Sequence, residues 1–531
     1  MHPVPAAPQA VPTSSLLKCL DNLDILCEIV RYGHGEAANA QPGDSALPQL
    51  ALVCRAFCEP ALDALWRSMG SLLPLLKLLP SFQEVNGVYV LLGPLQAEDW
   101  VRFDFYAKKV RAMKYTGITD IVIDPFVYVR IARYHPAPML PELRQLNYSS
   151  PSQSGPEIML FTAPSLHRLE IASENDEFGP TFTMLLSDAV ASMPELEHLA
   201  LDLLFPPIIL DFSLQFNHLR VLKILNIDKS VDLGNLEQFL EALSSFENIR
   251  SLTLSDIPHE SFDLRQVRTP EEDERVSTPV RRTFAFPGLR VLELSGDIQW
   301  ISHFITALET TVLHSVSFSA DFLVRDWREW LQFPLNHIVP RWSSSLENIS
   351  LHQLHSRARG SPTMDEDNFG QRFADLSTIR NLRQFSLSGS PPIWVREEDV
   401  AALATGCPNI VILQIDVHRN TALASFNSLI YLAEHCPLLR ELRMGFDVED
   451  VLMANMPTLL EHGLEVLFVY RTDGFRGANR HTIQAVARFL DCIFPKLKTV
   501  SGREDEWDEV DELIHILQGA RAHERRRLAY S

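Results

Sequence analysis

The chain has 531 residues, of which 46% are hydrophobic and 22% are charged, a balance typical of globular proteins. Its 68 acidic residues outnumber its 47 basic residues, so the formal net charge is −21. This charge repels a polyanion over most of the surface and argues against nucleic acid as a partner. No run of the sequence approaches the roughly 18 apolar residues of a membrane span, so we expect no membrane partner. Seven scattered cysteines predict a reducing compartment, cytoplasmic or nuclear.

The N-terminal part predicts a disordered segment over residues 1–15 and a small helical module over residues 16–79. The first 15 residues are rich in proline and carry no basic residue leading into an apolar core, unlike a signal peptide. In NLDILCEIVRYG, Asn22 is a candidate N-cap and Gly33 a stop signal. In LALVCRAFCEPALDALWRSM we expect a break at Glu59–Pro60 between two helices. Three short helices with two apolar faces leave one such face unpaired.

The same residues resemble the F-box family. DNLDILCEIV is similar to the family's Leu-Pro-x-Glu-Ile-Leu-x-x-Ile pattern, with Asp21–Asn22 in place of Leu-Pro and a longer insertion after the first helix. LALVCRAF followed by ALW is similar to its Leu-x-x-Val-Cys-Arg-x-Trp and Leu-Trp patterns. Downstream, DWVRFDFYAKKVRAM looks like the linker of fungal F-box proteins, so residues 80–109 are predicted to form a linker.

The resemblance implies a substrate receptor of a Skp-cullin-F-box ubiquitin ligase, whose partners are a Skp-type adaptor and a cullin scaffold. In that family the helical module docks on the adaptor. Carried over by motif position, the adaptor-facing candidates are Leu26, Ile29, Leu50, Val53, Cys54, Leu65 and Trp66. Some of these must also fill the core of the module, so either role is open for each of them.

From residue 110 onward the sequence repeats the phrase L-x-x-L-x-L. Examples are SLHRLEI, HLRVLKI, GLRVLEL, SLENISL, LLRELRM and GLEVLFV, with weaker copies at Val110, Leu143 and Leu497. The last two apolar positions, one residue apart, face the same side of a short strand. Segments with helical spacing, such as LEQFLEALSSF, lie between the phrases. This pattern is typical of leucine-rich repeats and predicts an α/β solenoid over residues 110–531, with a parallel sheet on the concave face and helices on the convex face.

Two further features complete the predicted solenoid. The Asn or Cys that such repeats usually carry beyond the strand is absent from the copies that align, so we expect irregular repeats in which other groups satisfy the backbone. EDEWDEVDELIHILQGARAHERRRL begins with acids and ends with bases, which complements a helix dipole and predicts a C-terminal cap helix.

The outward positions of the strands predict a surface for an unknown protein substrate. They mix both charge signs with many hydroxyl groups, which suits a protein or peptide better than a phosphate backbone. Phe468 and Tyr470 are the strongest candidates because aromatic side chains dominate interface hot spots, although packing against the cap helix is an equal alternative. The substrate-binding candidates are Arg168, Lys223, Glu293, His352, Gln414, Arg443, Phe468 and Tyr470.

The sequence carries no motif for catalysis or for a cofactor. It contains no phosphate-binding glycine loop, nucleophile elbow or paired-histidine zinc motif. Cys54 and Cys58 are four residues apart, but no second pair follows at ligand spacing, and Cys407 and Cys436 precede their phrases as core positions would. We therefore expect no enzyme, metal site or cofactor. Two functions remain open: the ligase receptor, and a non-ligase interaction scaffold whose helical module only caps the solenoid.

Overall fold

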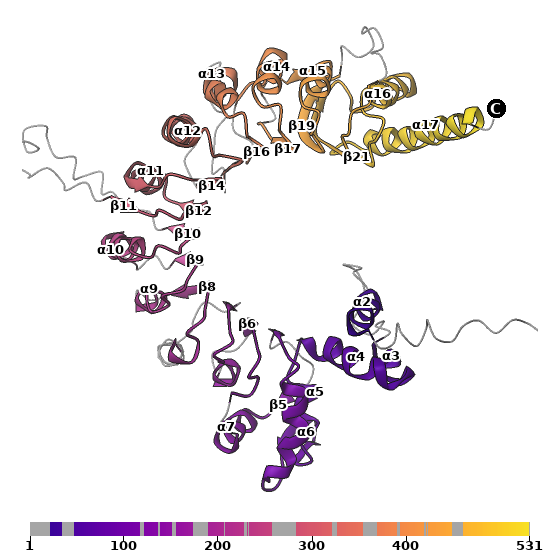
Figure 1. Ribbon diagram of the computed structural model, residues 1–531. Helices are drawn as coiled ribbons and strands as arrows, with labels where there is room; N and C mark the ends of the chain where they lie inside the picture. Colours follow the sequence, from indigo (N-terminus) through magenta and orange to yellow (C-terminus); the bar gives the residue numbers. More distant parts are fainter. Residues whose placement is uncertain are drawn as a thin grey trace, which may run out of the picture. The chain divides into compact units, whose positions relative to one another are not determined.

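The computed structural model describes residues 22–33, 47–116, 122–135, 138–150, 156–173, 190–205, 208–227, 231, 233–257, 283–320, 327–353, 369–389, 393–418, 421, 423–448 and 460–529. The N-terminal segment 1–15 and the insertion at 34–46, both singled out by the sequence, lie outside these residues. The chain divides into two compact units, Met1–Val221 and Leu222–Ser531. Both combine parallel strands with helices, so the α/β class is confirmed (Figure 1).

The first unit contains a helical bundle, a parallel sheet and a small second sheet. In the parallel sheet the strand order is β1-β4-β6-β7-β8, and in the small sheet it is β2-β3-β5. The elements are α2 (Leu23–Gly33), α3 (Leu47–Val53), α4 (Arg55–Arg67), β1 (Ser68–Met69), α5 (Leu73–Leu76), β2 (Phe82–Val85), β3 (Val88–Leu91), α6 (Ala97–Ala107), β4 (Ala112–Tyr115), β5 (Val122–Ile123), α7 (Pro125–Tyr134), β6 (Gln145–Ser150), η1 (Pro156–Phe161), β7 (Arg168–Ser173), η2 (Val190–Ser192), β8 (His198–Phe205) and α9 (Ile208–Ser213).

The second unit repeats a strand and a helix or turn along a parallel sheet. Its strand order is β9-β10-β12-β14-β15-β16-β17-β19-β20-β21. The elements are β9 (Val221–Ile227), α10 (Leu233–Ser244), β10 (Ser251–Ile257), β11 (Phe284–Ala285), β12 (Val291–Gly296), α11 (Ile298–Ala307), β13 (Leu308–Glu309), β14 (Ser315–Ala320), α12 (Trp327–Trp342), β15 (Asn348–Gln353), α13 (Phe369–Phe373), η5 (Ala374–Thr378), β16 (Gln384–Ser388), α14 (Glu397–Gly406), β17 (Ile412–Ile415), β18 (Ala424–Ser425), α15 (Ser428–His435), β19 (Glu441–Asp447), β20 (Val466–Asp473), α16 (Arg480–Ile493), β21 (Thr499–Gly502) and α17 (Glu506–Ala529).

The repeated phrases form the strands, and their apolar positions stack in register as predicted. Leu292 of β12 lies opposite Val316 of β14, which lies opposite Ile349 of β15, and all three are at most 1% exposed. The residues between the apolar positions, such as Glu293 and Ser317, remain half-exposed. In Figure 1 helices α10 to α16 lie on one side of these strands. The opposite side, which the intervening residues line, is called the open face below.

Donors placed just ahead of each strand satisfy the backbone. The amides of His314 and Ser315 both donate to the carbonyl oxygen of Arg290, at 2.8 and 3.0 Å. The same two-to-one arrangement recurs from strand to strand, and side chains in the preceding turns add to it. For example, Ser345 Oγ donates to the Leu313 carbonyl at 2.8 Å and Asn409 Nδ2 to the Arg380 carbonyl at 2.9 Å. These donors pair the backbone at the start of each strand.

The helical bundle has a small core of its own. Val30, Leu47 and Ala61 are buried at its centre, and partly buried Leu50, Ala51, Phe57 and Ala64 pack against them. Asn22 accepts from the amide of Asp24 at 3.0 Å, as an N-cap does, and α2 ends at Gly33. The predicted break at Glu59–Pro60 is wrong. Pro60 lies inside α4, and the break falls at Cys54, whose extended backbone (φ −160°, ψ 166°) separates α3 from α4.

Helix α4 runs directly into the sheet of the first unit. It ends at Arg67, and β1 begins at the next residue and pairs in parallel with β4, Met69 opposite Met113. The sheet therefore begins within the range predicted for the helical module, and α6 occupies much of the range predicted as a linker. The C-terminal helix is present as α17, which buries Trp507, Val510 and Ile514. No helix in the described part of the chain has both the length and the hydropathy needed to cross a bilayer.

Candidate functional site

The bundle exposes an apolar surface that its own core does not use. Three of the predicted adaptor-facing residues belong to it: Val53 is 65% exposed, Ile29 43% and Leu65 37%. Leu23, Ile25 and Leu52 are also exposed, Leu52 at 87%. Burying a side chain of this kind is worth about 1.5–3 kcal/mol, so leaving six of them in water favours a partner that covers them. We call Ile25, Ile29, Leu52, Val53 and Leu65 the apolar helical face; Leu23, two residues before Ile25 on α2, lies on the other side of that helix, toward α6.

The other adaptor-facing candidates lie deeper in the bundle. Leu26 is only 3% exposed, so it fills the interior of the module. Leu50 and Cys54 are half-buried, and Leu50 packs against the core. The ring of Trp66 lies 4.5 Å from that of Tyr106 on α6 and is half-buried there. The motif therefore supplies both core residues and surface residues, and only the packing separates them.

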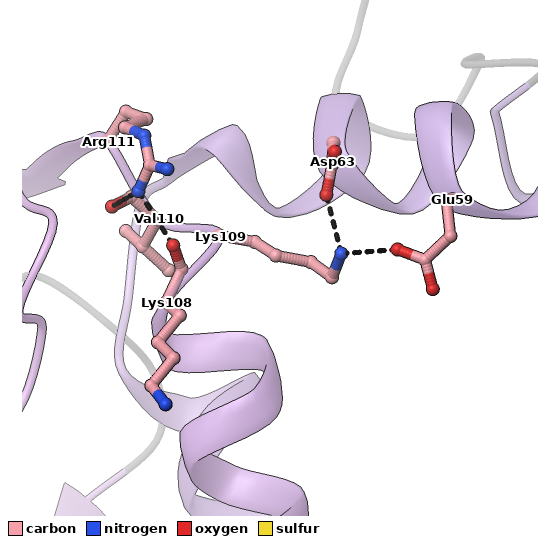
Figure 2. A network of polar contacts seen from close by, with 6 residues as sticks. All are labelled: Glu59, Asp63, Lys108, Lys109, Val110 and Arg111. Carbon is pink, nitrogen blue, oxygen red and sulfur yellow. Dashed lines mark hydrogen bonds and ion pairs between the residues drawn. The ribbon is translucent and has the colours of Figure 1, made fainter.

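Lys109 joins α4 to the turn ahead of β4. Its ammonium donates to Asp63 Oδ1 at 2.5 Å and to Glu59 Oε2 at 2.7 Å, one helical turn apart on α4 (Figure 2). It also lies 4.8 Å from the centre of the Phe105 ring. Burial by itself lowers the pKa of Lys109, but the hydrogen bonds and charges of Asp63 and Glu59 outweigh burial and raise it. Lys109 therefore stays charged at neutral pH and fixes α4 against the start of the sheet.

On the second unit, the open face carries a continuous row of polar residues. The pairing register aligns Thr253, Glu293, Ser317, Ser350, Ser386, Gln414, Arg443, Phe468 and Ser501. Thr253 Oγ1 donates to Glu293 Oε2 at 2.9 Å, and His352 lies beside this row with its Nδ1 2.6 Å from Ser388 Oγ. The structure thus brings seven of the eight substrate-binding candidates onto one face: Lys223, Glu293, His352, Gln414, Arg443, Phe468 and Tyr470.

An aromatic cluster occupies the C-terminal end of this face. The rings of Phe468 and Tyr470 lie 5.1 Å apart, and Gln414 Nε2 donates to Tyr470 Oη at 2.6 Å. The guanidinium groups of Arg443 and Arg503 lie 6.0 and 5.7 Å from the Phe468 and Tyr470 ring centres, respectively. Burial, followed by the charge of Asp416, raises the pKa of Tyr470. Its hydroxyl is therefore neutral at physiological pH and able to donate a hydrogen bond.

The aromatic pair and the cap helix make different contacts. Trp507 of α17 packs 4.7 Å from the Phe475 ring and donates from Nε1 to Thr472 Oγ1 at 3.1 Å. Phe468 and Tyr470 stay half-exposed on the open face. Two substrate-binding candidates lie apart from the cluster: Lys223 is on β9, at the other end of the open face, and Arg168 belongs to the first unit and pairs with Glu170 on its own strand.

The thiols of Cys407 and Cys436 lie in the core of the second unit. Burial raises the pKa of Cys407 and of Cys436 to about 12, so both remain protonated at neutral pH. Both are fully buried, which confirms their assignment to the core. Within the described residues no group of three His, Cys, Asp or Glu side chains is placed to hold a metal ion.

Sequence reasoning missed three contributors to these surfaces. Leu52 is next to the motif position Val53 but is not itself a motif position, although its apolar side chain is evident in the sequence. Arg503 follows the weak phrase at Leu497, and the strand assignment would have placed it beside Tyr470. Nothing in the sequence indicated that Lys109 pairs with Glu59 and Asp63, because they are 50 and 46 residues apart.

No protein-family model matches the chain, and no curated protein matches it.

Proposed function

We propose that this protein is the substrate receptor of a Skp-cullin-F-box type ubiquitin ligase, with the helical module docking on the adaptor and the open face of the sheet binding the protein to be ubiquitinated. The apolar helical face is the single observation that supports this most. It lies on the segment whose motif resembles the F-box, and it stays exposed after the bundle has filled its own core.

The open face fits the second half of this proposal. Its middle strands carry small hydroxyl side chains, and its C-terminal end carries Phe468 and Tyr470 flanked by arginines. Aromatic and arginine anchors with a polar surround are the composition of a protein-binding hot spot. The half-exposure of both rings leaves area for a partner to bury.

Co-purification tests the adaptor interaction. The full chain is expressed with a Skp-type adaptor and a cullin, and complex formation is measured at moderate salt. Val53→Asp combined with Leu65→Asp should abolish the complex, since each places a charge in the centre of an apolar contact. Phe126→Asp, at an exposed apolar position on α7 away from this face, is the matched control and should leave the complex intact. No complex with the unsubstituted chain would refute the proposal.

A specific observation favours the second candidate, a non-ligase scaffold. Strand β1 follows α4 without a linker and pairs with β4, so the helical module covers the first strand of its sheet, as a solenoid cap does. In that case no adaptor binds, and the exposed side chains of Val53 and Leu65 contribute to neither binding nor the core. Val53→Asp with Leu65→Asp would then leave the thermal midpoint nearly unchanged, and the unsubstituted chain would form no adaptor complex.

A further inference from the structure

A groove runs between the helical bundle and α6 in the first unit. It has a volume of about 1280 Å³ and is lined by residues of α2, α4, α6 and the turn ahead of β4. Its apolar lining includes Leu23, Val101 and Phe105, which are 64%, 70% and 46% exposed. Val101 and Phe105 are one helical turn apart on α6, so they offer adjacent apolar positions to a helical partner.

One end of the groove is basic. Arg67, Lys108 and Arg111 line it where α4 and α6 end, and the Arg111 guanidinium lies against the Lys108 carbonyl (Figure 2). The amide of Arg111 donates to the Arg67 carbonyl, and the amide of Arg144 donates to the Arg111 carbonyl. Arg67, Arg111 and Arg144 therefore occupy successive strand starts, about 4.8 Å apart. We call Arg67, Lys108, Arg111 and Arg144 the basic edge.

The charges of the basic edge are largely uncompensated. Within the described part of the chain, Arg67, Lys108 and Arg144 make no ion pair, and Arg111 lies 3.8 Å from Glu142. The acids of the groove are already engaged, Glu59 and Asp63 by Lys109 and Asp104 by His135 at 2.9 Å. Four cations with one nearby carboxylate, in a protein of net charge −21, give this edge a local positive charge.

We propose that this groove binds an acidic amphipathic helix of a partner protein, with the apolar side of the helix on Leu23, Val101 and Phe105 and its carboxylates on the basic edge. Apolar anchors at helical spacing are how helices bind in grooves, and charge complementarity sets their orientation. A nucleic acid fits less well, because its phosphates find no partner in the exposed apolar lining of Leu23, Val101 and Phe105, and a net charge of −21 repels a long polyanion. The proposal is independent of the ligase function, since the side chains that distinguish it lie on α6 and the basic edge.

Fluorescence anisotropy with the full chain tests this binding. The probe is a fluorescein-labelled helical peptide of about 15 residues with leucines at i, i+3, i+4 and i+7 and glutamates on the remaining face. We expect saturable binding with Kd below about 100 μM that weakens with salt. A peptide with lysines in place of the glutamates, and one with serines in place of the leucines, should each bind at least about tenfold more weakly.

Two variants locate the binding in the groove. The double substitution Arg67→Glu with Lys108→Glu should raise the Kd of the acidic peptide by about tenfold or more, and so should Phe105→Ser by itself. Arg102→Glu, on α6 but outside the groove lining, and Phe126→Ser, on α7, are the matched controls and should leave Kd unchanged. Val53→Asp with Leu65→Asp should abolish adaptor binding but leave the Kd of the acidic peptide unchanged. This difference separates the two proposals. Circular dichroism checks that each variant is folded.

Three results would overturn the proposal. The first is that the acidic peptide fails to bind, or binds no more tightly than the basic one. The second is that a single-stranded RNA of about 15 nucleotides displaces the acidic peptide, which would assign the basic edge to nucleic acid. The third is a concentration-dependent dimer in analytical ultracentrifugation that Phe105→Ser dissociates, which would assign the groove to a second copy of this chain.

Discussion

Lys109 Nζ lies 2.5 Å from Asp63 Oδ1 and so ties the turn ahead of β4 to helix α4. Together with the direct passage of α4 into β1, this contact sets the orientation of the helical module against the first strands of its sheet. The helical module is thereby held in a fixed orientation to the sheet of the first unit.

Replacing Lys109 with methionine should lower stability by about 1 kcal/mol, a value at the upper end for an ion pair whose acids are exposed. The methionine keeps the apolar contact with Phe105 but loses both hydrogen bonds to α4. In differential scanning calorimetry the transition of the first unit should fall by about 2–4 °C. Lys108→Met is the matched control, because Lys108 is exposed and makes no ion pair in the described structure. If the two substitutions lowered the transition temperature equally, the ion pairs of Lys109 with Asp63 and Glu59 would contribute nothing to stability.

Leu26→Ala should destabilise the helical module by about 2–5 kcal/mol, since Leu26 is 3% exposed and its removal leaves a cavity. Leu52→Ala, at a side chain that is 87% exposed, should change stability by less than about 0.5 kcal/mol. Hydrogen–deuterium exchange of peptides from α2 to α4 reports both effects. Faster exchange in the Leu52 variant than in the Leu26 variant would reverse the assignment of core and surface.

Gly296→Ala should destabilise the second unit by at least about 2 kcal/mol. Gly296 has φ +134°, and a Cβ there would lie 2.4 Å from the Ile257 carbonyl oxygen of the neighbouring strand. Gly519→Ala is the control: this glycine is exposed on helix α17 with open space around it, so alanine should be neutral or stabilise by up to about 1 kcal/mol. Thermal unfolding measures both changes. If Gly296→Ala left the free energy of unfolding unchanged, that result would contradict the backbone geometry at Gly296.

Because His462 is buried, we expect the protein to lose stability at acidic pH. Its Nε2 lies 2.8 Å from the Cys436 carbonyl and donates to it, while Nδ1 accepts from the Leu464 amide at 3.1 Å. Burial above all lowers the pKa of His462, and the charges of Arg440 and Lys496 lower it further. The folded chain therefore holds this ring neutral below about pH 6.5, where the unfolded chain protonates it.

The free energy of unfolding should accordingly decrease as pH falls below about 6.5, until the folded ring also takes up a proton. His462→Gln retains a side-chain donor but does not titrate, so the difference in thermal midpoint between the two proteins should vary across pH 5–8. A difference that stays constant with pH would mean that His462 does not couple folding to protonation.

Much of the second unit was predictable from the spacing of its apolar residues. The phrase L-x-x-L-x-L predicts a strand with one buried side, and Leu292, Val316 and Ile349 stack as expected. The same alternation predicts which positions face outward, and it places Gln414, Arg443 and Tyr470 on one face. The small sheet of β2, β3 and β5 and the strand β1 were missed, because two to four residues carry too little periodicity to be recognised.

The sequence by itself determined the α/β class, the repeated strands and the apolar surplus in the helical module, because these depend on local periodicity. Only the tertiary structure decided which part of that surplus faces outward. Leu26 and Ile29 lie three residues apart on α2 and so face similar directions, yet Leu26 is 3% exposed and Ile29 is 43% exposed. The bridge from Lys109 to α4 and the basic edge also required the fold, since they join side chains that are distant in the sequence.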